Sequence, residues 1–149
     1  MKIYYREKSG GIEILRCFGI EGRVEIPGMI DGKLVISAAP YAFSSHMDEK
    51  EDLKNASLWE VSDGLEFGRE EHVLAGNDVE EIVFPYTLKE IGRYIFYGCG
   101  NLKKLEFSDS LMQIGCGAFT GCHALEKLTV HMRQGKKSGV KEMLGEMWQ

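Results

Sequence analysis

The residues of this chain that could carry out nucleophilic or metal chemistry are its four cysteines and four histidines. None of them has the Cys-x-x-Cys or His-Glu-x-x-His spacing that arranges ligands around zinc. Cys122 and His123 are adjacent, but neighbouring side chains on a turn usually point apart, so the pair does not indicate a nucleophile with its base. We therefore predict a protein that is not an enzyme and that has no catalytic residue, metal site or cofactor.

The charged runs of the sequence do not indicate a ligand site either. The acidic run at 47–52 lacks the alternating Asp/Asn spacing, central Gly and terminal Glu of a calcium-binding EF-hand, and we interpret it as a solvated insertion. The basic run at 133–137 is short, and the whole chain has 18 Lys and Arg against 23 Asp and Glu. Because nucleic-acid binding usually needs a basic surface, we expect no nucleic-acid partner.

Length and hydropathy indicate one ordinary folded domain. The chain has 149 residues, of which 44% are hydrophobic, so it can bury a core and is not disordered as a whole. No stretch approaches the ~20 consecutive apolar residues of a membrane span. Residues 1–8 have no apolar signal-peptide core, so the sequence as written predicts a cytoplasmic protein.

The elements that must position any site are set by an internal repeat of 23 residues. Ile82, Leu105 and Leu128 occupy equivalent positions, and the stretches that begin at Ile82 and Leu105 agree at nine positions without a gap. The shared positions include Ile91-Gly92 with Ile114-Gly115, Phe96 with Phe119, and Cys99 with Cys122. Apolar residues at fixed offsets within a period of about 20 to 29 residues are typical of leucine-rich repeats.

The N-terminal half carries the same pattern in a looser form. The segment at 24–27 parallels 82–85, and residues 31–35 then form a short insertion. Residues 41–43 parallel 117–119, and Leu53 to Leu58 are assigned to the position of Leu102 to Phe107. We predict about four to five turns, with the pattern blurred at 59–78.

The repeat reads Ile-Gly-x-x-Ala-Phe-x-Gly-Cys-x-x-Leu at 114–125, and the chain opens with Gly11-Ile12-Glu13-Ile14. In these features it resembles the BspA-type bacterial leucine-rich repeat family over most of residues 10–130. The resemblance implies an interaction surface, which in several members is adhesive. Because members are often secreted or attached to the cell surface, the resemblance also leaves a secreted or cell-surface location open as an alternative to the cytoplasm.

The alternation of residue types predicts parallel strands. Leu105 and Phe107 alternate with Lys104 and Glu106, which is the period of a half-buried strand. Strands that recur along a repeat lie parallel, and the residues between them form the return path of each turn. We therefore predict a leucine-rich-repeat solenoid of short parallel strands with irregular or short helical return segments.

The return path contributes apolar residues to the same core. We expect Ile91 and Ile114 to point inward from it, with Gly92 and Gly115 forming the turn that follows each of them. Phe96 and Phe119 fill the interior, one ring in each turn.

Both ends of a solenoid expose its core and need a cover. Two short apolar segments at 3–6 and 12–15, joined through 9–11, predict a hairpin cap. Apolar residues between 140 and 148 have helical spacing, with Ser138 as N-cap, and predict a helix that covers the last turn or docks on another chain. The plan is one leucine-rich-repeat domain, 1–149, with a cap at 1–22, repeats at 23–131, and a linker and helix at 132–149.

The cysteines are expected to be structural. Cys99 and Cys122 are equivalent in the repeat and should lie about 4.8 Å apart in neighbouring turns. That distance permits a disulfide, although parallel side chains seldom offer the required dihedral angle. We favour buried, reduced cysteines throughout, since a free cysteine behaves as a small apolar residue.

The outward positions of the predicted strands form two columns across the sheet. The first column is Arg23, Asn55, Glu81, Lys104 and Lys127, and the second is Glu25, Ser57, Val83, Glu106 and Thr129. We expect Glu81 to pair with Lys104, and the neighbouring Lys104 and Lys127 to leave positive charge at the C-terminal end. Val83 is an apolar residue exposed on this face, as at sites that a partner covers.

These features predict a non-catalytic module that binds a protein or a peptide through the exposed face of its sheet. The first alternative is an inert structural or truncated repeat without a partner of its own. The second is a small hydrolase or transferase, which would need convergent polar groups in a pocket that the sequence does not supply.

Overall fold

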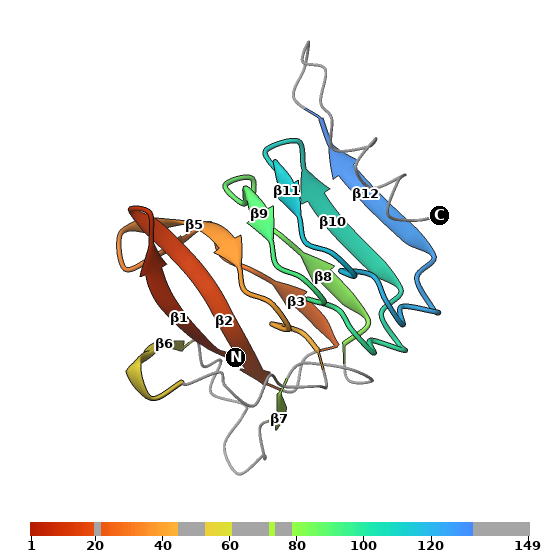
Figure 1. Ribbon diagram of the computed structural model, residues 1–149, viewed down its shortest axis with the longest axis horizontal. Helices are drawn as coiled ribbons and strands as arrows, with labels where there is room; N and C mark the ends of the chain where they lie inside the picture. Colours follow the sequence, from red (N-terminus) through yellow and green to blue (C-terminus); the bar gives the residue numbers. More distant parts are fainter. Residues whose placement is uncertain (20–21, 45–52, 61–71, 74–78, 133–149) are drawn as a thin grey trace.

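The computed structural model describes residues 1–19, 22–44, 53–60, 72–73 and 79–132 and shows a solenoid of strands and turns (Figure 1). The strands are β1 (Lys2–Lys8), β2 (Gly11–Gly19), β3 (Arg23–Glu25), β4 (Met29–Ile30), β5 (Lys33–Ala38), β6 (Ser57–Glu60), β7 (His72–Val73), β8 (Glu81–Val83), β9 (Glu90–Ile91), β10 (Lys104–Ser108), β11 (Gln113–Ile114) and β12 (Lys127–His131). Within the described chain, the helical structure is one 3-10 turn, η1 (Leu53–Asn55). The predicted helix at 138–148 lies outside the described residues, as do the charged runs at 47–52 and 133–137.

Two sheets enclose the core. One is a parallel sheet of four strands in the order β12-β10-β8-β3, with one strand from each turn (Figure 1). The other has eight strands, and its main path is β11-β9-β5-β2-β1-β6. In this sheet β5, β9 and β11 are short parallel strands on the return path of successive turns. The predicted parallel-strand solenoid is therefore confirmed, with about four turns.

The strand register follows the repeat in the sequence. β10 pairs with β12 so that Leu105 lies opposite Leu128, and with β8 so that Leu105 lies opposite Ile82. Within β10, Leu105 and Phe107 are buried, whereas Lys104 is exposed and Glu106 is partly exposed. One face of the four-stranded sheet therefore points into the core and the other points to solvent, as the alternation predicted.

The N-terminal hairpin is present and is longer than predicted. β1 and β2 pair antiparallel, and they turn through Ser9 and Gly10, which both have positive φ angles. β2 also pairs in parallel with β5, so the hairpin extends the eight-stranded sheet beyond the solenoid turns. A two-residue turn with positive φ at both positions matches the twist of a hairpin, which explains why the glycine stands there.

The insertion predicted at 31–35 forms a second, smaller hairpin. β4 pairs antiparallel with the start of β5, and the chain turns through Asp31 and Gly32, with φ angles of 52° and 73°. The Thr87 hydroxyl donates a hydrogen bond to the Val35 carbonyl at 2.6 Å, which ties this hairpin to the next turn.

The assignment of residues 53–58 to a turn of the solenoid is wrong. β3 pairs directly with β8, while β6 pairs antiparallel with β1 at the edge of the other sheet. Leu58, which was matched to a buried core position, is 46% exposed. A few apolar residues in alternation are compatible with an antiparallel edge strand as well as with a parallel one. Here the segment pairs with the edge of β1 that β2 leaves open.

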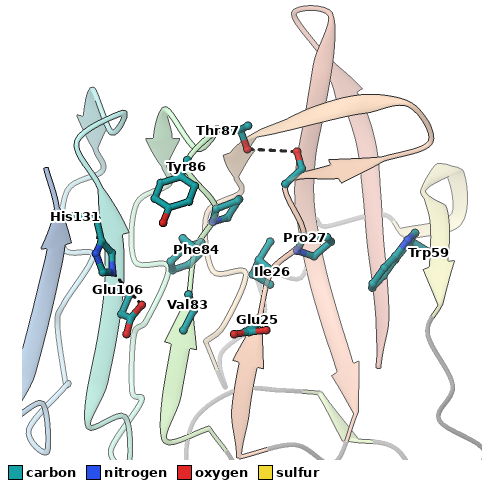
Figure 2. Close-up of a pocket in the computed structure, with 12 residues that line it drawn as sticks. Glu25, Ile26, Pro27, Trp59, Val83, Phe84, Tyr86, Thr87, Glu106 and His131 are labelled. Atoms are coloured by element: carbon teal, nitrogen blue, oxygen red, sulfur yellow. Dashed lines mark hydrogen bonds and ion pairs between the residues drawn. The ribbon is translucent and has the colours of Figure 1, made fainter. Parts of the chain in front are cut away.

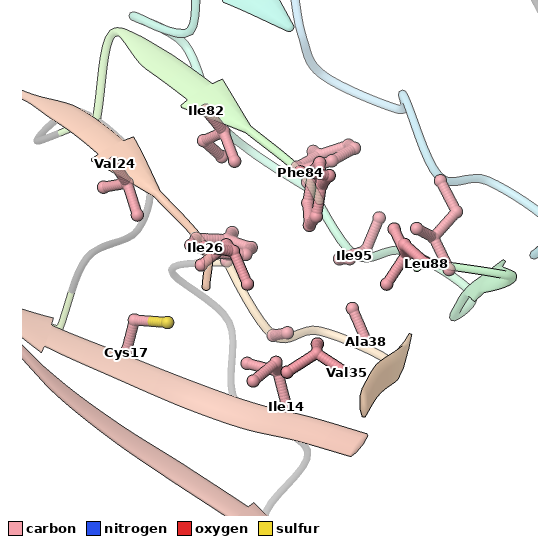
Figure 3. Close-up of a cluster of buried hydrophobic side chains, with 14 of the residues drawn as sticks. Ile14, Cys17, Val24, Ile26, Val35, Ala38, Ile82, Phe84, Leu88 and Ile95 are labelled. Carbon is pink, nitrogen blue, oxygen red and sulfur yellow. The ribbon is translucent and has the colours of Figure 1, made fainter. Parts of the chain in front are cut away.

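Phenylalanine rings fill the core in two stacked series. Phe43, Phe96 and Phe119 have ring centroids 6.2 Å and 5.7 Å apart on the return path, and Phe84 stacks on Phe107 at 5.1 Å. Figure 3 shows Phe84 pointing inward from the end of β8, on the same side as the buried residue Ile82. Phe96 is fully buried, whereas Phe119 and Ile114 are half-buried, because the described solenoid continues on only one side of their turn.

Gly92 and Gly115 have a different role from the one predicted. A methyl group on Gly92 would lie 2.3 Å from the Pro40 nitrogen, and one on Gly115 would lie 2.2 Å from the Arg93 nitrogen. Side-chain atoms do not approach a backbone so closely, so these positions need glycine because successive turns touch there. The positive φ angles of the return path occur instead at Tyr41, Tyr94, Gly98, Gly117 and Gly121.

Candidate protein-binding face

The exposed face of the four-stranded sheet brings eight of the ten predicted site residues together. The first column is Arg23, Glu81, Lys104 and Lys127, and the second is Glu25, Val83, Glu106 and Thr129. Each residue lies directly opposite its neighbours in the parallel register, about 4.8 Å from the next strand. Asn55 and Ser57 are not part of these columns, because they lie in η1 and in β6, which pairs with β1.

Arg23 determines the charge pairing at one end of the face. Its guanidinium lies 2.9 Å from Glu25 and 3.5 Å from Glu81. The hydrogen bond to Glu25 raises the pKa of Arg23, so the guanidinium stays charged. The pair predicted between Glu81 and Lys104 is not found in the described structure, because the forked side chain of Arg23 reaches Glu81 from the other side.

The two columns differ in charge. In the first, Lys104 and Lys127 are exposed neighbours, and neither forms an ion pair within the described part of the chain. The second contains two carboxylates, Glu25 and Glu106, with Val83 between them. A partner that covers both columns therefore meets a basic row and an acidic row side by side.

A shallow groove of about 500 Å³ lies beside the second column, toward the carboxyl ends of the strands (Figure 2). Its floor includes Val83 and the segment that follows β8, and Glu25 and Glu106 lie on either side of Val83. Trp59 lines it from β6, across the groove from His131 at the end of β12 (Figure 2). The groove thus combines strand residues with aromatic side chains from outside the four-stranded sheet.

Contacts among the lining residues order one wall of the groove. His131 Nε2 lies 3.2 Å from a carboxylate oxygen of Glu106. The ring of Tyr86 meets the His131 ring edge-on at 6.4 Å, and Tyr86 itself is 72% exposed. The sequence reasoning did not identify this groove, because Tyr86 and His131 follow their strands and Trp59 belongs to no turn of the repeat.

Cys99, Cys116 and Cys122 lie on the return path, and Cys17 lies in β2 of the hairpin. Cys99 donates a thiol hydrogen bond to the Phe43 carbonyl at 3.0 Å, and its repeat equivalent Cys122 donates one to the Phe96 carbonyl at 3.4 Å. Burial raises the pKa of the Cys122 thiol to about 12, with a further contribution from Cys99. The expectation of burial is wrong for Cys116, which is exposed because its position in the repeat is that of the exposed Arg93.

A second polar cluster joins the N-terminal hairpin to the solenoid. Glu13, which is 2% exposed, accepts contacts from Arg6 at 2.6 Å, Lys8 at 3.0 Å and the Ser37 hydroxyl at 3.0 Å. Lys8 and Ser37 also donate to Glu90, and chiefly the bond from Lys8 lowers the pKa of that carboxyl group. The charges in this cluster are paired with one another, so we interpret it as a structural contact between strands.

The described residues contain no group of three or more His, Cys, Asp or Glu side chains that could hold a metal ion. No helix in the same part of the chain is long and apolar enough to cross a membrane.

Comparison with known proteins connects these turns to a family. Residues 70–138 match the model described as "BspA type Leucine rich repeat region (6 copies)". The fold search found the crystal structure of a leucine-rich repeat protein from T. pallidum, with 15% sequence identity and a TM-score of 0.43, covering 97% of this chain and 92% of that one. The search of curated proteins found no match.

Proposed function

Because residues 70–138 form a repeat region of the BspA-type leucine-rich repeat family, we propose that the protein is a non-catalytic module that binds another protein, or a peptide segment of one, through the exposed face of its four-stranded sheet. The family suggests protein interaction in general terms. The choice of this face is our own inference. The partner is a protein whose surface chemistry complements the two columns.

The strand register is the observation that supports this face. It sets four outward positions of each column on four parallel strands, from β3 to β12, so that eight side chains form one continuous surface. A sheet face built in this way is rigid, since the backbone of each strand is hydrogen-bonded to its neighbours. A rigid backbone loses little conformational entropy on binding, which favours recognition.

The ends of the solenoid fit the same plan. The β1–β2 hairpin extends the eight-stranded sheet past β5, which supports the assignment of residues 1–22 to an N-terminal cap. The repeat region at 23–131 then forms one domain with that cap, although β6 within it pairs with the cap strand β1, and the segment at 132–149 is its linker and end. Many members of the family are secreted or attached to the cell surface, so the partner is to be sought there as well as in the cytoplasm.

Charge reversal in the first column tests the proposal. The double variant Lys104→Glu and Lys127→Glu changes two exposed, neighbouring side chains and leaves the core untouched. We expect it to lose the partner that the wild-type chain captures from native lysate, with no decrease in melting temperature. The readout is pull-down followed by mass spectrometry.

A matched control keeps the net charge change and moves it off the columns. The double variant Lys89→Glu and Lys103→Glu alters two exposed lysines outside them and should retain the captured partner. If the Lys104 and Lys127 variant keeps the partner as well, this face is not the binding surface. If both variants lose it, binding follows net charge and the proposal fails.

A further inference from the structure

The groove beside the second column has an acidic lining. Of its twelve lining residues, Glu25 and Glu106 carry a negative charge, and none is lysine or arginine. Its remaining charge-bearing group is the imidazole of His131. Three basic side chains of the face, Arg23, Lys104 and Lys127, belong to the neighbouring column and do not line the groove, although the Arg23 guanidinium lies 2.9 Å from Glu25. Arg23 offsets part of the negative charge, so the acidic character of the lining is carried chiefly by Glu106.

The two carboxylates flank one apolar residue of the floor. Glu25 and Glu106 lie on either side of Val83 in register, two strand spacings or about 10 Å apart. Val83 is partly exposed between them and gives the floor an apolar patch. A side chain with an apolar stem and a charged end fits such a floor, because the stem covers the valine while the end stays in reach of a carboxylate.

Contacts within the chain orient both carboxylates. Arg23 contacts Oε1 of Glu25, and His131 contacts Oε2 of Glu106. Each of these two carboxylates therefore has one charged or ionisable neighbour in these contacts. An ionised carboxylate accepts hydrogen bonds at both oxygens, so these internal contacts orient the two groups without saturating them.

The aromatic side chains of the groove favour the same kind of ligand. Tyr86 lines the side next to His131, and Trp59 lines the opposite side, where Figure 2 shows it beyond Pro27. The faces of aromatic rings attract cations that lie within about 6 Å of the ring centre. Tyr86 contacts the His131 ring at one edge but is 72% exposed, so much of its surface is accessible to a ligand.

We infer that this groove binds an arginine or lysine side chain presented by an extended segment of the partner protein. The aliphatic stem lies over Val83, and the charged end interacts with one of the flanking carboxylates, chiefly that of Glu106, between the aromatic walls. The inference rests on the proposed function, because it identifies the part of the sheet face that selects the partner and the chemistry of the segment selected.

Selection from a random peptide library tests the inference with the full chain. A phage-displayed library of dodecapeptides is selected on the immobilised wild-type protein, and we expect the enriched peptides to share an arginine or lysine. One enriched peptide is then synthesised and titrated into the Trp148→Phe variant, in which Trp59 is the sole tryptophan and reports groove occupancy by fluorescence. Replacing the shared basic residue with norleucine should weaken binding about tenfold or more.

Variants of the protein complete the test. In the Trp148→Phe background, Glu25→Gln with Glu106→Gln should weaken the peptide about tenfold or more, because it removes both charges and keeps the side-chain shapes. The control Glu80→Gln with Glu126→Gln removes two exposed carboxylates outside the groove and should change affinity less than about twofold. Selection on a Glu25→Lys and Glu106→Lys variant should enrich acidic peptides instead, provided its melting temperature matches the wild type.

The outcomes separate this inference from the proposed function. Enrichment of neutral or acidic peptides that the Lys104→Glu and Lys127→Glu variant no longer binds overturns the inference and leaves the proposed function in place. Peptides whose binding is unchanged by variants in either column contradict both. If no peptide is enriched over an empty support, the inference fails, and the native pull-down alone then decides the proposed function.

Discussion

The α-carbon of Gly92 packs directly on the backbone of Pro40 in the preceding turn, so that a methyl group there would lie 2.3 Å from the Pro40 nitrogen. The same contact recurs one turn later between Gly115 and Arg93. These two glycines therefore set how closely successive turns approach on the return path.

Replacing Gly92 with alanine should lower the free energy of unfolding by about 2 to 4 kcal/mol. The added methyl group would meet backbone atoms, which can move only if two turns separate, and overpacking of this kind is among the larger single-residue effects. Urea unfolding followed by circular dichroism measures the change. Gly22→Ala is the matched control, because a side chain at exposed Gly22 would meet nothing within 4 Å. Equal stability of the two variants would contradict the tight contact.

Truncation of Phe96 should destabilise the protein by about 3 to 5 kcal/mol, as for other buried aromatic residues. Phe96 is fully buried and stacks between Phe43 and Phe119, so Phe96→Ala removes contacts in three successive turns. The control is Tyr86→Ala, since that ring is 72% exposed. The same urea titration applies to both, and a decrease below about 1 kcal/mol for Phe96→Ala would be the behaviour of a surface residue.

Cysteine accessibility should single out Cys116. It is exposed, whereas Cys17 and Cys99 are buried and the Cys122 thiol has a strongly raised pKa. A thiol reagent such as Ellman's reagent at pH 8 should therefore label one site quickly in the native protein. In the Cys116→Ser variant the remaining thiols should react at least about 100-fold more slowly, because they must wait for local opening. Rapid labelling of that variant would contradict the burial of the other three.

Alkaline pH should weaken the contribution of Cys122 to stability. Its folded pKa is about 12 against an ordinary value of 9.0, so between these values the unfolded chain loses a proton that the folded chain keeps. Stability therefore falls as pH rises from about 9 to 12, with the full contribution present below pH 9. We expect the wild type to lose unfolding free energy relative to Cys122→Ala as the pH rises across this window, because the variant has no thiol to ionise. A difference that stays constant from pH 8 to 11 would contradict the raised pKa.

Acid should act on Glu90 with the opposite sign. Its pKa lies below the ordinary value of 4.5, chiefly because Lys8 donates to it, so its contribution is present above that value and is lost as pH falls. Glu90→Gln should cost about 0.5 to 1.5 kcal/mol at pH 7 and little at pH 3. Urea unfolding at the two pH values measures this, with Glu126→Gln, an exposed carboxylate, as control. An equal cost of Glu90→Gln at both pH values would show that the bond from Lys8 does not stabilise the fold.

The repeat spacing was sufficient to predict the register of the four-stranded sheet. Ile82, Leu105 and Leu128 lie opposite one another as their 23-residue spacing required, because a slip by one residue would turn every apolar side chain to solvent. The insertion at 31–35 was also predictable, since Asp31 and Gly32 form a typical hairpin turn.

Other features depend on contacts that a repeat pattern does not encode. Leu58 fitted the apolar spacing of the repeat, yet its strand, β6, pairs with the edge strand β1. The apolar spacing did not determine which of the two sheets this strand would join. The pattern marked Gly92 as special but did not distinguish a turn from a close approach of two backbones. The groove combines Trp59 and Tyr86, which lie far apart in the repeat scheme, so only the folded chain reveals it.

The direct pairing of β3 with β8 has a consequence for the order in which the protein assembles. Arg23 lies opposite Glu81, 58 positions along the chain, whereas Glu81 and Lys104 are 23 positions apart. Closing the longer loop costs about 0.8 kcal/mol more in chain entropy, so the contacts among β8, β10 and β12 are the cheaper ones to form first. The β1–β2 hairpin is more local still, because a two-residue turn joins its strands. We therefore expect two nuclei, one at each end of the sequence, with the β3–β8 seam as the last step of folding and the first place where hydrogen exchange reports opening.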